Sequence, residues 1–333
     1  MPLAFPLQHA RLVPDRIEVA GVSLSHPDRL LFPAARATKL DLARYDERIA
    51  DWILPHLVDR PLTLVRCPNG VSAGTKRAGD PSTRAGSSRA ASRDDCFYFK
   101  HSKVWTWPAI RRVRIREKTK IGEYMVVDSL RALVSLVQMG VVEIHTWNSR
   151  VADLERPDRI VIDLDPGARV AWRTVVDAAR LVRRLLSVLD LESFVKTTGG
   201  RGLHVVVPLT PAAGWSDCLE FARAFASALV RRQPSLFTER FAKLGRDDRI
   251  LVDYLRNNRT NTSIAAYSTR ARPDATVSVP LTWQELSPAR EPDRFTITTV
   301  PTRLARLQTD PWRKYWRTRQ RIPPRAVDAL EAM

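Results

Sequence analysis

Two aspartates, Asp163 and Asp165, give the strongest chemical signal in the sequence. They close the run RIVIDLDP, residues 159–166, whose apolar residues predict a buried strand. Because alternate residues of a strand point to one face, both carboxylates would face the same way. Two carboxylates so close together repel each other unless they share a cation. Mg²⁺ and Mn²⁺ prefer oxygen ligands, so the pair suggests a site for divalent ions.

A third carboxylate, Asp253, lies in a second apolar run, ILVDYL, residues 250–255. An unpaired charge is costly in such a strand, so we expect a neighbouring strand to carry Asp253 beside the first pair. Three carboxylates around two ions are the minimum for in-line phosphoryl or nucleotidyl transfer. An isolated D-x-D pair more often marks a turn or a salt-bridged strand end. The catalytic interpretation therefore depends on the proximity of Asp253 to the other two aspartates.

A glycine-rich turn, KTTGGRGLHV at residues 196–205, lies between two predicted strands. Glycines permit a positive φ and a close approach of the backbone to a ligand. Exposed N–H groups and polar side chains of this turn could bind a triphosphate. A tight hairpin with a structural histidine is the alternative. The candidate nucleotide-binding residues here are Thr198, Gly199, Gly200, Arg201 and His204.

Two further clusters could contribute to the same site. His145 lies at a strand end in IHTWN, residues 144–148, where a purely structural histidine is the alternative. Arg270 and Arg272 alternate in YSTRARP, residues 267–273. Both arginines could neutralise phosphate charge, or they could form an ordinary solvated pair.

The charge of the chain points to a polyanionic partner. The 333 residues include 54 Lys and Arg against 36 Asp and Glu, which gives a net charge of +18. Such an excess is typical of nucleic-acid-binding proteins, although soluble arginine-rich proteins without such a partner also show it. Basic residues recur at every second position from 112 to 120, so an extended backbone would place them on one face. That face would suit a phosphate backbone or would simply be solvated. These residues are Arg112, Arg114, Arg116, Lys118 and Lys120.

Predicted strands and helices alternate along the chain, which favours an α/β class with mixed sheets. Helical periodicity covers Lys39 to Leu54, and Pro55 would end this helix. The other expected helices are Ser129–Met139, Val170–Leu189 and Trp215–Arg232. The expected strands are Pro61–Arg66, Tyr124–Val127, Val142–Trp147, Arg159–Leu164, Ser193–Lys196, Leu203–Leu209, Ile250–Leu255 and Thr262–Tyr267.

Residues 71–95 are rich in Gly, Ser, Ala, Thr and Arg, which predicts a flexible basic loop.

The cysteines and the apolar runs of the chain predict the cellular compartment. Cys67, Cys96 and Cys218 are few, odd in number and far apart, so they argue against a disulfide scaffold and fit a reducing compartment. No run of ~18 apolar residues would span a membrane, and the N-terminus lacks the pattern of a signal peptide. We therefore expect a cytoplasmic protein.

Taken together and in this order, the motifs resemble the polymerase domain of bacterial ligase D, a member of the archaeo-eukaryotic primase superfamily. The resemblance extends from Val19 to Trp316. It rests on the strings HPDRLLFP, DRPLTLVRCP, CFYFKH, EIHTWNSR, PDRIVIDLDP, KTTGGRGLHVVVPL, DYLRNNRTNTSIAAYSTRARP and VPLTW. It implies a primase-polymerase fold with an RRM-like catalytic core and an N-terminal α/β lobe.

The resemblance also implies how the chain is divided. We expect a single primase-polymerase domain over residues 1–330, in two lobes. Residues 1–122 would form the N-terminal lobe, with the elements for the 5′-phosphate and the template and the flexible insert at 71–95. Residues 123–300 would form the catalytic core, and 301–333 a basic, Trp-rich C-terminal tail.

Roles for the nucleotide site follow from the same resemblance. The three aspartates would hold two ions, Mn²⁺ or Mg²⁺. Thr198, His204 and Arg270 would contact the incoming nucleotide, and His145 would lie by its sugar or an active-site water. Where Thr198 stands, the family usually has serine, so the hydroxyl is retained.

The resemblance assigns DNA contacts as well. Phe97 and Tyr98 would stack on the template, and Lys100 would touch DNA nearby. Arg29 and Lys39 would bind a 5′-phosphate on the downstream side of a gap. The family usually has lysine in place of Arg29 and a second phenylalanine in place of Tyr98. Arginine keeps the charge of lysine but changes the geometry of phosphate binding.

The implied activity is DNA-dependent nucleotidyl transfer. The enzyme would extend primer 3′-OH ends at gaps or double-strand breaks, with a preference for ribonucleotides, in non-homologous end joining. Its partners would be DNA with a 5′-phosphate, nucleoside triphosphates and, by analogy, Ku and a separate ATP-dependent DNA ligase. No ligase or phosphoesterase motif is recognised, so we expect a stand-alone form or a piece of a larger enzyme, acting at the nucleoid. A de novo primase, a non-catalytic DNA end-binding factor and a nuclease or phosphatase are the alternatives.

Overall fold

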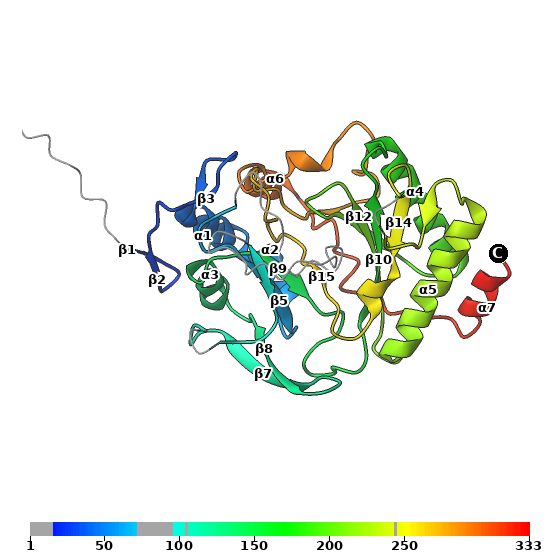
Figure 1. Ribbon diagram of the computed structural model, residues 1–333, viewed down its shortest axis with the longest axis horizontal. Helices are drawn as coiled ribbons and strands as arrows, with labels where there is room; N and C mark the ends of the chain where they lie inside the picture. Colours follow the sequence, from blue (N-terminus) through cyan, green and yellow to red (C-terminus); the bar gives the residue numbers. More distant parts are fainter. Residues whose placement is uncertain (1–15, 72–95, 104–105, 243–244) are drawn as a thin grey trace, which may run out of the picture.

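The computed structural model describes residues 16–71, 96–103, 106–242 and 245–333. The chain forms a mixed α/β fold with a six-stranded and a four-stranded sheet flanked by helices (Figure 1). The loop expected at 71–95 lies outside the described residues, apart from Val71. Among the described residues, no helix combines the length and the apolar character needed to cross a membrane.

The six-stranded sheet has the order β13-β14-β10-β12-β11-β16 and is antiparallel except between β13 and β14. Helices α4 (Trp172–Val188) and α5 (Trp215–Arg232) pack against it, on the right of Figure 1. Both helices agree with the sequence prediction within two residues. The strands are β10 (Arg159–Pro166), β11 (Phe194–Thr197), β12 (Leu203–Pro208), β13 (Phe237–Thr238), β14 (Ile250–Asp253) and β16 (Pro280–Leu281).

The two faces of β10 have different neighbours because its side chains alternate. Ile160 and Ile162 belong to the main apolar core. Val161 instead packs with Trp312 and other aromatic residues of the C-terminal tail. By the same alternation, the two aspartates of β10 follow Val161 on the second face. The tail therefore covers part of the sheet face that carries the carboxylates.

The four-stranded sheet has the order β15-β9-β5-β6 and is antiparallel. Its strands are β5 (Leu62–Arg66), β6 (Phe97–Phe99), β9 (Val141–Thr146) and β15 (Ser263–Ile264). Helix α3 (Leu130–Gln138) packs on β9, and α1 (Lys39–Arg48) packs on α3 and on α2 (Ala50–Leu57). This sheet positions β6, with its aromatic residues, two strands away from β9.

The remaining elements are short. Three strand pairs form separate two-stranded sheets, and two helices follow near the C-terminus. They are β1 (Arg16–Val19) with β2 (Val22–Ser25), β3 (Leu30–Phe32) with β4 (Ala37–Thr38), β7 (Arg111–Arg116) with β8 (Ile121–Val126), α6 (Thr299–Arg306) and α7 (Ala326–Glu331).

The single helix expected at 39–54 is wrong, because the structure has two helices there. Ile49 interrupts the helical path with φ −107° and ψ 11°. Pro55 lies inside α2 instead of ending it. The last turn of α2 buries His56 and Leu57, so packing holds one more turn than the proline alone would allow.

Two expected strands are shorter in the structure. The strand at 250–255 ends at Asp253, whose Oδ1 accepts a hydrogen bond of 3.0 Å from the backbone N–H of Leu255. That contact starts the 3₁₀ turn η2 (Tyr254–Asn257). The strand at 262–267 is reduced to β15, and the positive φ of 65° at Tyr267 is incompatible with its continuation.

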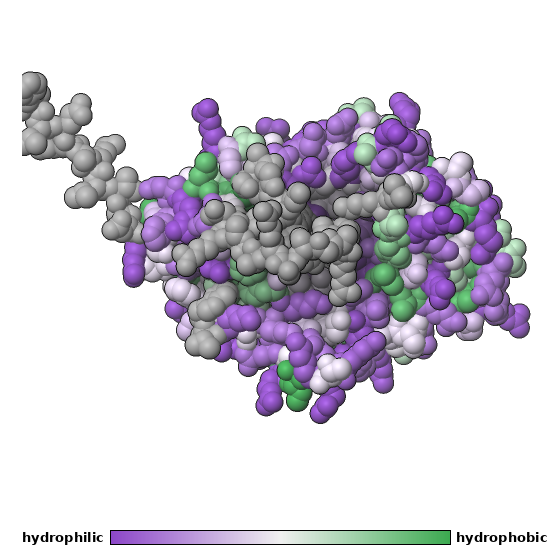
Figure 2. Space-filling view, viewed as in Figure 1, coloured by the Kyte–Doolittle hydropathy of each residue, from purple (hydrophilic) through white to green (hydrophobic). Residues whose placement is uncertain are grey.

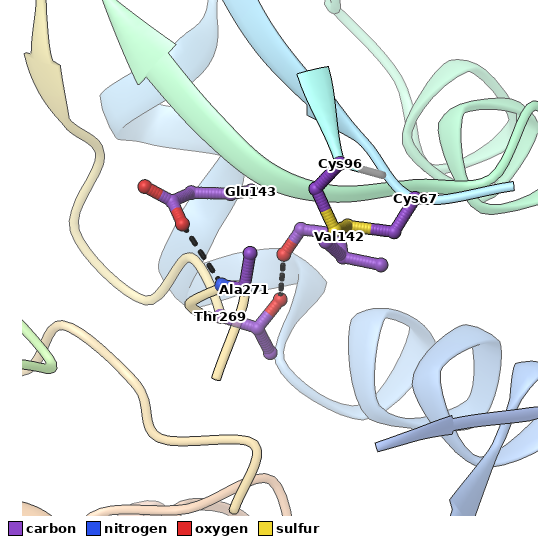
Figure 3. Close-up of a disulfide and its surroundings, with 6 residues drawn as sticks. All are labelled: Cys67, Cys96, Val142, Glu143, Thr269 and Ala271. Carbon is purple, nitrogen blue, oxygen red and sulfur yellow. Dashed lines mark hydrogen bonds between the residues drawn. A yellow bond between two sulfur atoms is a disulfide. The ribbon is translucent and has the colours of Figure 1, made fainter. Parts of the chain in front are cut away.

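The cysteines contradict the expectation drawn from the sequence. Cys67 and Cys96 form a disulfide (Figure 3), and Cys218 is buried and free. Cys67 follows β5 and Cys96 precedes β6, and these strands pair antiparallel with Arg66 opposite Phe97. The ends of two neighbouring strands therefore bring the cysteines together, although 29 positions separate them.

His56 is buried at the junction of α2 and the C-terminal tail. Its ring centroid lies 4.9 Å from that of Trp316 and 5.7 Å from that of Trp312. Burial, followed by the positive charges of Arg159 and Arg60, holds the pKa of His56 well below 6.5. The folded protein therefore keeps this imidazole neutral at pH values where the unfolded chain protonates it.

We expect acid to destabilise the protein through His56. The unfolded state binds the proton first, so the stability contribution is complete above pH 6.5 and declines as the pH falls below that value. At pH 5.5 the loss attributable to His56 should be about 1.4 kcal/mol. Urea unfolding of wild type and His56→Gln at pH 7.5 and 5.5 measures the difference. His26→Asn, at an exposed histidine, is the control; an unchanged pH dependence in His56→Gln would contradict this prediction.

Candidate active site at the paired carboxylates

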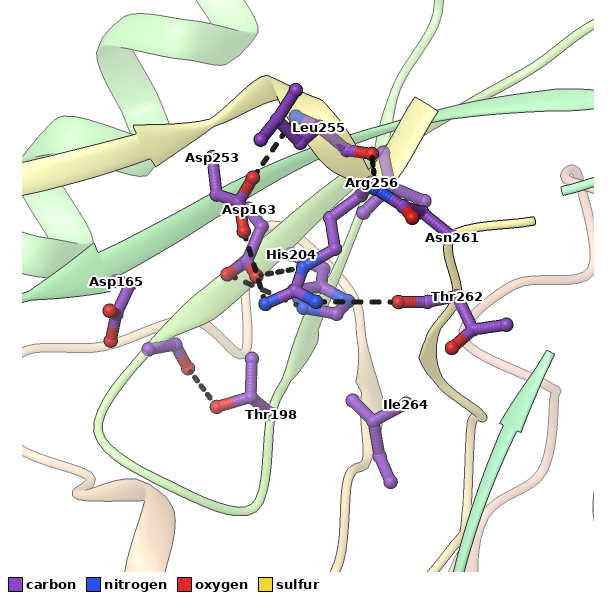
Figure 4. Close-up of polar contacts among 12 residues, drawn as sticks. Asp163, Asp165, Thr198, His204, Asp253, Leu255, Arg256, Asn261, Thr262 and Ile264 are labelled. Atoms are coloured by element: carbon purple, nitrogen blue, oxygen red, sulfur yellow. Dashed lines mark hydrogen bonds and ion pairs between the residues drawn. The ribbon is translucent and has the colours of Figure 1, made fainter. Parts of the chain in front are cut away.

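The register of three strands brings the candidate carboxylates and a histidine together. Asp163 of β10 is directly opposite Asp253 of β14 on one side and opposite His204 of β12 on the other. Asp165 lies two positions further along β10, toward the strand end. Figure 4 shows these side chains around the ends of the three strands. The proximity of Asp253 to the other two aspartates was predicted from the sequence, but the pairing of residues between the strands was not.

An arginine that the sequence analysis did not select bridges two of the carboxylates. Nε of Arg256 lies 3.0 Å from Oδ2 of Asp163, and its Nη2 lies 3.1 Å from Oδ2 of Asp253. Arg256 is three residues after Asp253, on the 3₁₀ turn η2. A cation between the two carboxylates offsets the repulsion that their closeness creates.

The pKa values of the carboxylates diverge because their surroundings differ. Burial alone would raise the pKa of Asp163, but His204 and Arg256 together hold it well below its usual value. Burial raises the pKa of Asp253 to about 6, despite the nearby Arg256. Partial desolvation of its carboxyl group, followed by the charge of Asp163, raises the pKa of Asp165, although half of its side chain is exposed. Such divergence among clustered acids is common at functional sites.

His204 is a neutral donor at this site. Burial, with the charge of Lys196 added, lowers the pKa of His204 to about 4. Its Nε2 lies 3.4 Å from Oδ1 of Asp163. Burial therefore favours the uncharged ring of His204 beside Asp163, whereas Arg256 supplies positive charge to this carboxylate.

Asp165 differs from the other two aspartates in its exposure. Its side chain is 52% exposed and its Oδ2 lies 2.8 Å from Nη2 of Arg246. In Figure 4 it stands apart from the cluster around Arg256. As the side chains are placed, no three His, Cys, Asp or Glu groups within the described ranges converge as metal ligands. The donor set nevertheless suits hard divalent ions, since all three side chains are carboxylates on adjacent strands.

The glycine turn has a tightly packed backbone. Gly199 has a φ of +67°, and a Cβ added to it would lie 2.6 Å from Cγ of Arg270. Nη1 of Arg270 donates to the backbone O of Thr198 at 3.0 Å. The hydroxyl of Thr198 donates to the backbone O of Gly202 at 3.1 Å and accepts from the N–H of Gly200 at 3.3 Å. The structure thus joins Arg270 to the turn, and its role toward a nucleotide stays a prediction.

A buried glutamate connects the turn to His145. Glu143 of β9 is fully buried, and its Oε1 lies 2.8 Å from Nε2 of His145 and 3.3 Å from Nε of Arg270. The sequence analysis missed Glu143, although a carboxylate in the apolar run VVEIHT was a detectable signal. The ring of Tyr98 lies 5.6 Å from that of His145, which places the aromatic strand β6 beside this network.

Of the two other candidates, Arg201 points away from the turn and Arg272 lies beside it. Arg201 donates to the backbone O atoms of Ala168 and Val170 at 2.7 and 2.8 Å. Its guanidinium therefore holds the adjacent loop and is not part of the turn's polar lining. Arg272 lies near Gly200, since a Cβ on that glycine would meet its Nη1 at 3.3 Å.

The candidate residues for the 5′-phosphate are already occupied by protein contacts. Lys39 is only 4% exposed, and its Nζ donates to Oε1 of Gln138 at 2.7 Å and to the backbone O of Ser25 at 3.0 Å. Burial, with the charge of Arg29 added, lowers the pKa of Lys39 to about 8. Arg29 donates to the backbone O of Pro68 at 2.8 Å. Their role in phosphate binding remains a prediction.

The remaining DNA candidates lie on or near the surface. Phe97 and Tyr98 are partly buried on β6, and Nζ of Lys100 donates to the backbone O of Thr260 at 3.3 Å. The expected row of five cations is shorter, because β7 ends at residue 116 and the last two lysines follow it. The molecular face in Figure 2 is mostly hydrophilic, with only small apolar groups. The three cations that share an exposed face of β7 are Arg112, Arg114 and Arg116.

Comparison with protein families identifies this architecture. Residues 38–312 match the family model described as LigD, primase-polymerase domain. The multifunctional non-homologous end joining protein LigD of Pseudomonas aeruginosa is 38% identical over 321 residues, 95% of this chain and 36% of that protein. The LigD protein of Mycolicibacterium smegmatis is 32% identical over 80% of this chain and 32% of its own length. The chain thus spans about a third of these relatives.

A solved structure shows the same fold. The polymerase domain from Mycobacterium tuberculosis ligase D, in complex with DNA, superposes with a TM-score of 0.77 at 30% identity. The superposition covers 89% of this chain and 98% of that one. This likeness confirms the expected archaeo-eukaryotic primase fold. The chain therefore belongs to the LigD primase-polymerase domain family, a family of DNA-directed nucleotidyltransferases.

Proposed function

We propose that the chain extends primer 3′-OH ends at gaps or double-strand breaks in DNA. The observation that carries the proposal is the strand register that sets Asp253 opposite Asp163, with His204 on the other side. This register supplies the acidic centre that in-line nucleotidyl transfer requires. The 3′ oxygen would form a bond to the α-phosphorus, the bond to the β-phosphate oxygen would break, and pyrophosphate would leave.

Asp163, Asp165 and Asp253 are the residues that would hold two divalent ions, Mg²⁺ or Mn²⁺. Such ions would activate the attacking hydroxyl and neutralise charge on the departing pyrophosphate. Arg256 neutralises part of the acidic centre by forming ion pairs with two of the carboxylates. The exposure of the Asp165 side chain gives the centre a side open to substrate.

The glycine turn would bind the incoming nucleotide. In this proposal the turn at Thr198, Gly199 and Gly200 would offer backbone N–H groups and a hydroxyl to the triphosphate. Arg270 would neutralise phosphate charge, and Arg272 lies near enough to Gly200 to assist. His145, held by Glu143, would lie by the sugar or an active-site water. Ribonucleotides are the preferred substrates in this proposal.

DNA would lie along the surface that carries β6 and β7. Tyr98 is close to His145, so a template base stacked on the aromatic pair would lie near the nucleotide. The polymerase domain of the Mycobacterium tuberculosis enzyme was solved with DNA, and the relatives are named for non-homologous end joining. We propose the same pathway here, at the nucleoid in the cytoplasm, with Ku and an ATP-dependent DNA ligase as partners.

Extension of a gapped duplex with a 5′-phosphate tests the proposal. We expect template-dependent addition to the primer in the presence of Mn²⁺ or Mg²⁺, with ribonucleotides preferred over deoxynucleotides. The two ions and the two nucleotide classes are compared on one primer-template, so that only the ion or the nucleotide changes between assays. Unprimed single strands should give no product.

The same assay separates the alternatives. Products on unprimed strands would indicate a primase. Binding of the gapped DNA without any nucleotide addition would indicate an end-binding factor. Release of mononucleotides or phosphate without addition would indicate a nuclease or phosphatase. Each of these outcomes would contradict the proposal.

A further inference from the structure

A basic cavity lies beside the candidate active site but has a different lining. It has a volume of about 660 Å³, and residues between 285 and 307 line it, on the 3₁₀ turn η3 (Pro292–Arg294), on α6 and on the chain beside them. Small-molecule sites in proteins have volumes of this order. No residue assigned above to metal, nucleotide or DNA lines this cavity. The lining residues used below are Glu285, Arg290, Arg294, Phe295, Arg303 and Arg306.

Within the described residues, three of the four arginines around the cavity have no acidic partner. Arg303 forms an ion pair with Glu285 at 2.6 Å. No carboxylate in the described part of the chain lies within ion-pair distance of the other three, Arg290, Arg294 and Arg306. This holds for Glu291 too, although it lines the same cavity. Nη1 of Arg303 is buried and has no hydrogen-bond partner there. An anion in the cavity would offset the charge of these three arginines.

The end of helix α6 explains only part of this charge. Arg303 and Arg306 lie in the last turn of α6, where the helix dipole favours cations. Arg294 belongs to η3, and Arg290 precedes it, so neither benefits from that helix end. The dipole of α6 therefore does not explain why Arg290 and Arg294, which lie outside this helix, line the same cavity.

We propose that this cavity binds a phosphorylated nucleotide unit, either a free nucleotide or the terminal unit of a strand. The planar guanidinium of arginine matches the oxygens of a phosphate group. Leu307, which is partly exposed, adds apolar surface that suits the nucleoside part of such a ligand. The proposal goes beyond polymerisation and does not depend on the role of the aspartates.

Hydrogen bonds place this cavity behind the glycine turn. The backbone O of Phe295 accepts from the N–H of Val277 at 2.7 Å. The neighbouring Thr276 donates from its hydroxyl to the backbone O of Gly199 at 2.6 Å. One short segment thus contacts the cavity on one side and the candidate nucleotide turn on the other. The two sites are adjacent but have different linings.

The test compares ligand binding by wild type and Arg290→Ala/Arg294→Ala, both as full chains with EDTA present. The probes are adenosine monophosphate and inorganic phosphate by calorimetry, and a labelled tetrathymidylate with and without a 5′-phosphate by anisotropy. We expect the double variant to weaken binding of phosphorylated probes about tenfold for each arginine. His204→Ala/Arg270→Ala, altered at the candidate active site, should retain binding to the cavity. Arg173→Ala/Arg184→Ala, at exposed residues of α4, removes the same charge elsewhere.

The outcomes are distinct. Preference for the monophosphate assigns the cavity to free nucleotide, and preference for the 5′-phosphorylated strand assigns it to a strand end. Equal affinity in wild type and Arg290→Ala/Arg294→Ala would overturn the proposal, as would an equal loss in the α4 control. Tighter binding of an acidic peptide than of any phosphorylated probe would also overturn it.

Discussion

Asp163→Asn should lower the rate of nucleotide addition by at least about a thousandfold, a loss of about 4 kcal/mol of transition-state stabilisation. Asparagine keeps the shape of the side chain but removes the charge that divalent ions require. Asp163 is the position to change first, because the structure sets it between Asp253 and His204. Single-turnover extension of a gapped duplex measures the effect, since it separates chemistry from product release.

Folding and DNA binding should survive this change. Arg256 retains Asp253 at 3.1 Å, and the loss of one carboxylate reduces repulsion at the centre. Asp165→Asn should show a similar loss of rate. Asp248→Asn, at an exposed aspartate paired with Arg169, is the matched control. Extension by Asp163→Asn at a rate near that of wild type would refute the assignment of the acidic centre.

The sequence predicts candidate catalytic residues more readily than it predicts their arrangement in space. The alternation in RIVIDLDP places Asp163 and Asp165 on one face, because side-chain direction in a strand is a local property. The partner of Asp163 on β14 depends on strand register, which the packing of the whole sheet decides. Arg256 and Glu143 were not predicted as site residues, because each contacts site residues that are distant in the chain.

The errors in the sequence analysis have similar causes. Pro55 stays inside α2 because its neighbours are buried, and burial outweighs a local helix-breaking tendency. Long-range contacts also escape local patterns: Lys39, whose expected role at a 5′-phosphate stays a prediction, bonds to Gln138 on α3, 99 positions away. Contacts of this range leave no mark on local composition or periodicity. The family resemblance supplied the overall fold, which such local patterns could not.

Breaking the disulfide should produce the largest change in stability. A cross-link between residues 29 positions apart contributes about 3 to 4 kcal/mol by restricting the unfolded chain. We therefore expect Cys67→Ala/Cys96→Ala, or wild type in dithiothreitol, to unfold at markedly lower urea concentration. Without reductant, the unfolded wild type should show one titratable thiol, from Cys218. Three thiols would contradict the disulfide.

The disulfide should also affect DNA binding, because it holds the strand that carries the candidate template-stacking residues. It ties the start of β6 to the end of β5, while β6 has only three residues and pairs with no other strand in the described part of the chain. That short edge strand carries Phe97 and Tyr98, so its loosening should weaken template binding more than nucleotide binding. Cys218→Ala, at a buried cysteine of α5, controls for loss of core volume. If reductant weakens DNA binding equally in wild type and Cys67→Ala/Cys96→Ala, the effect does not come from this bond.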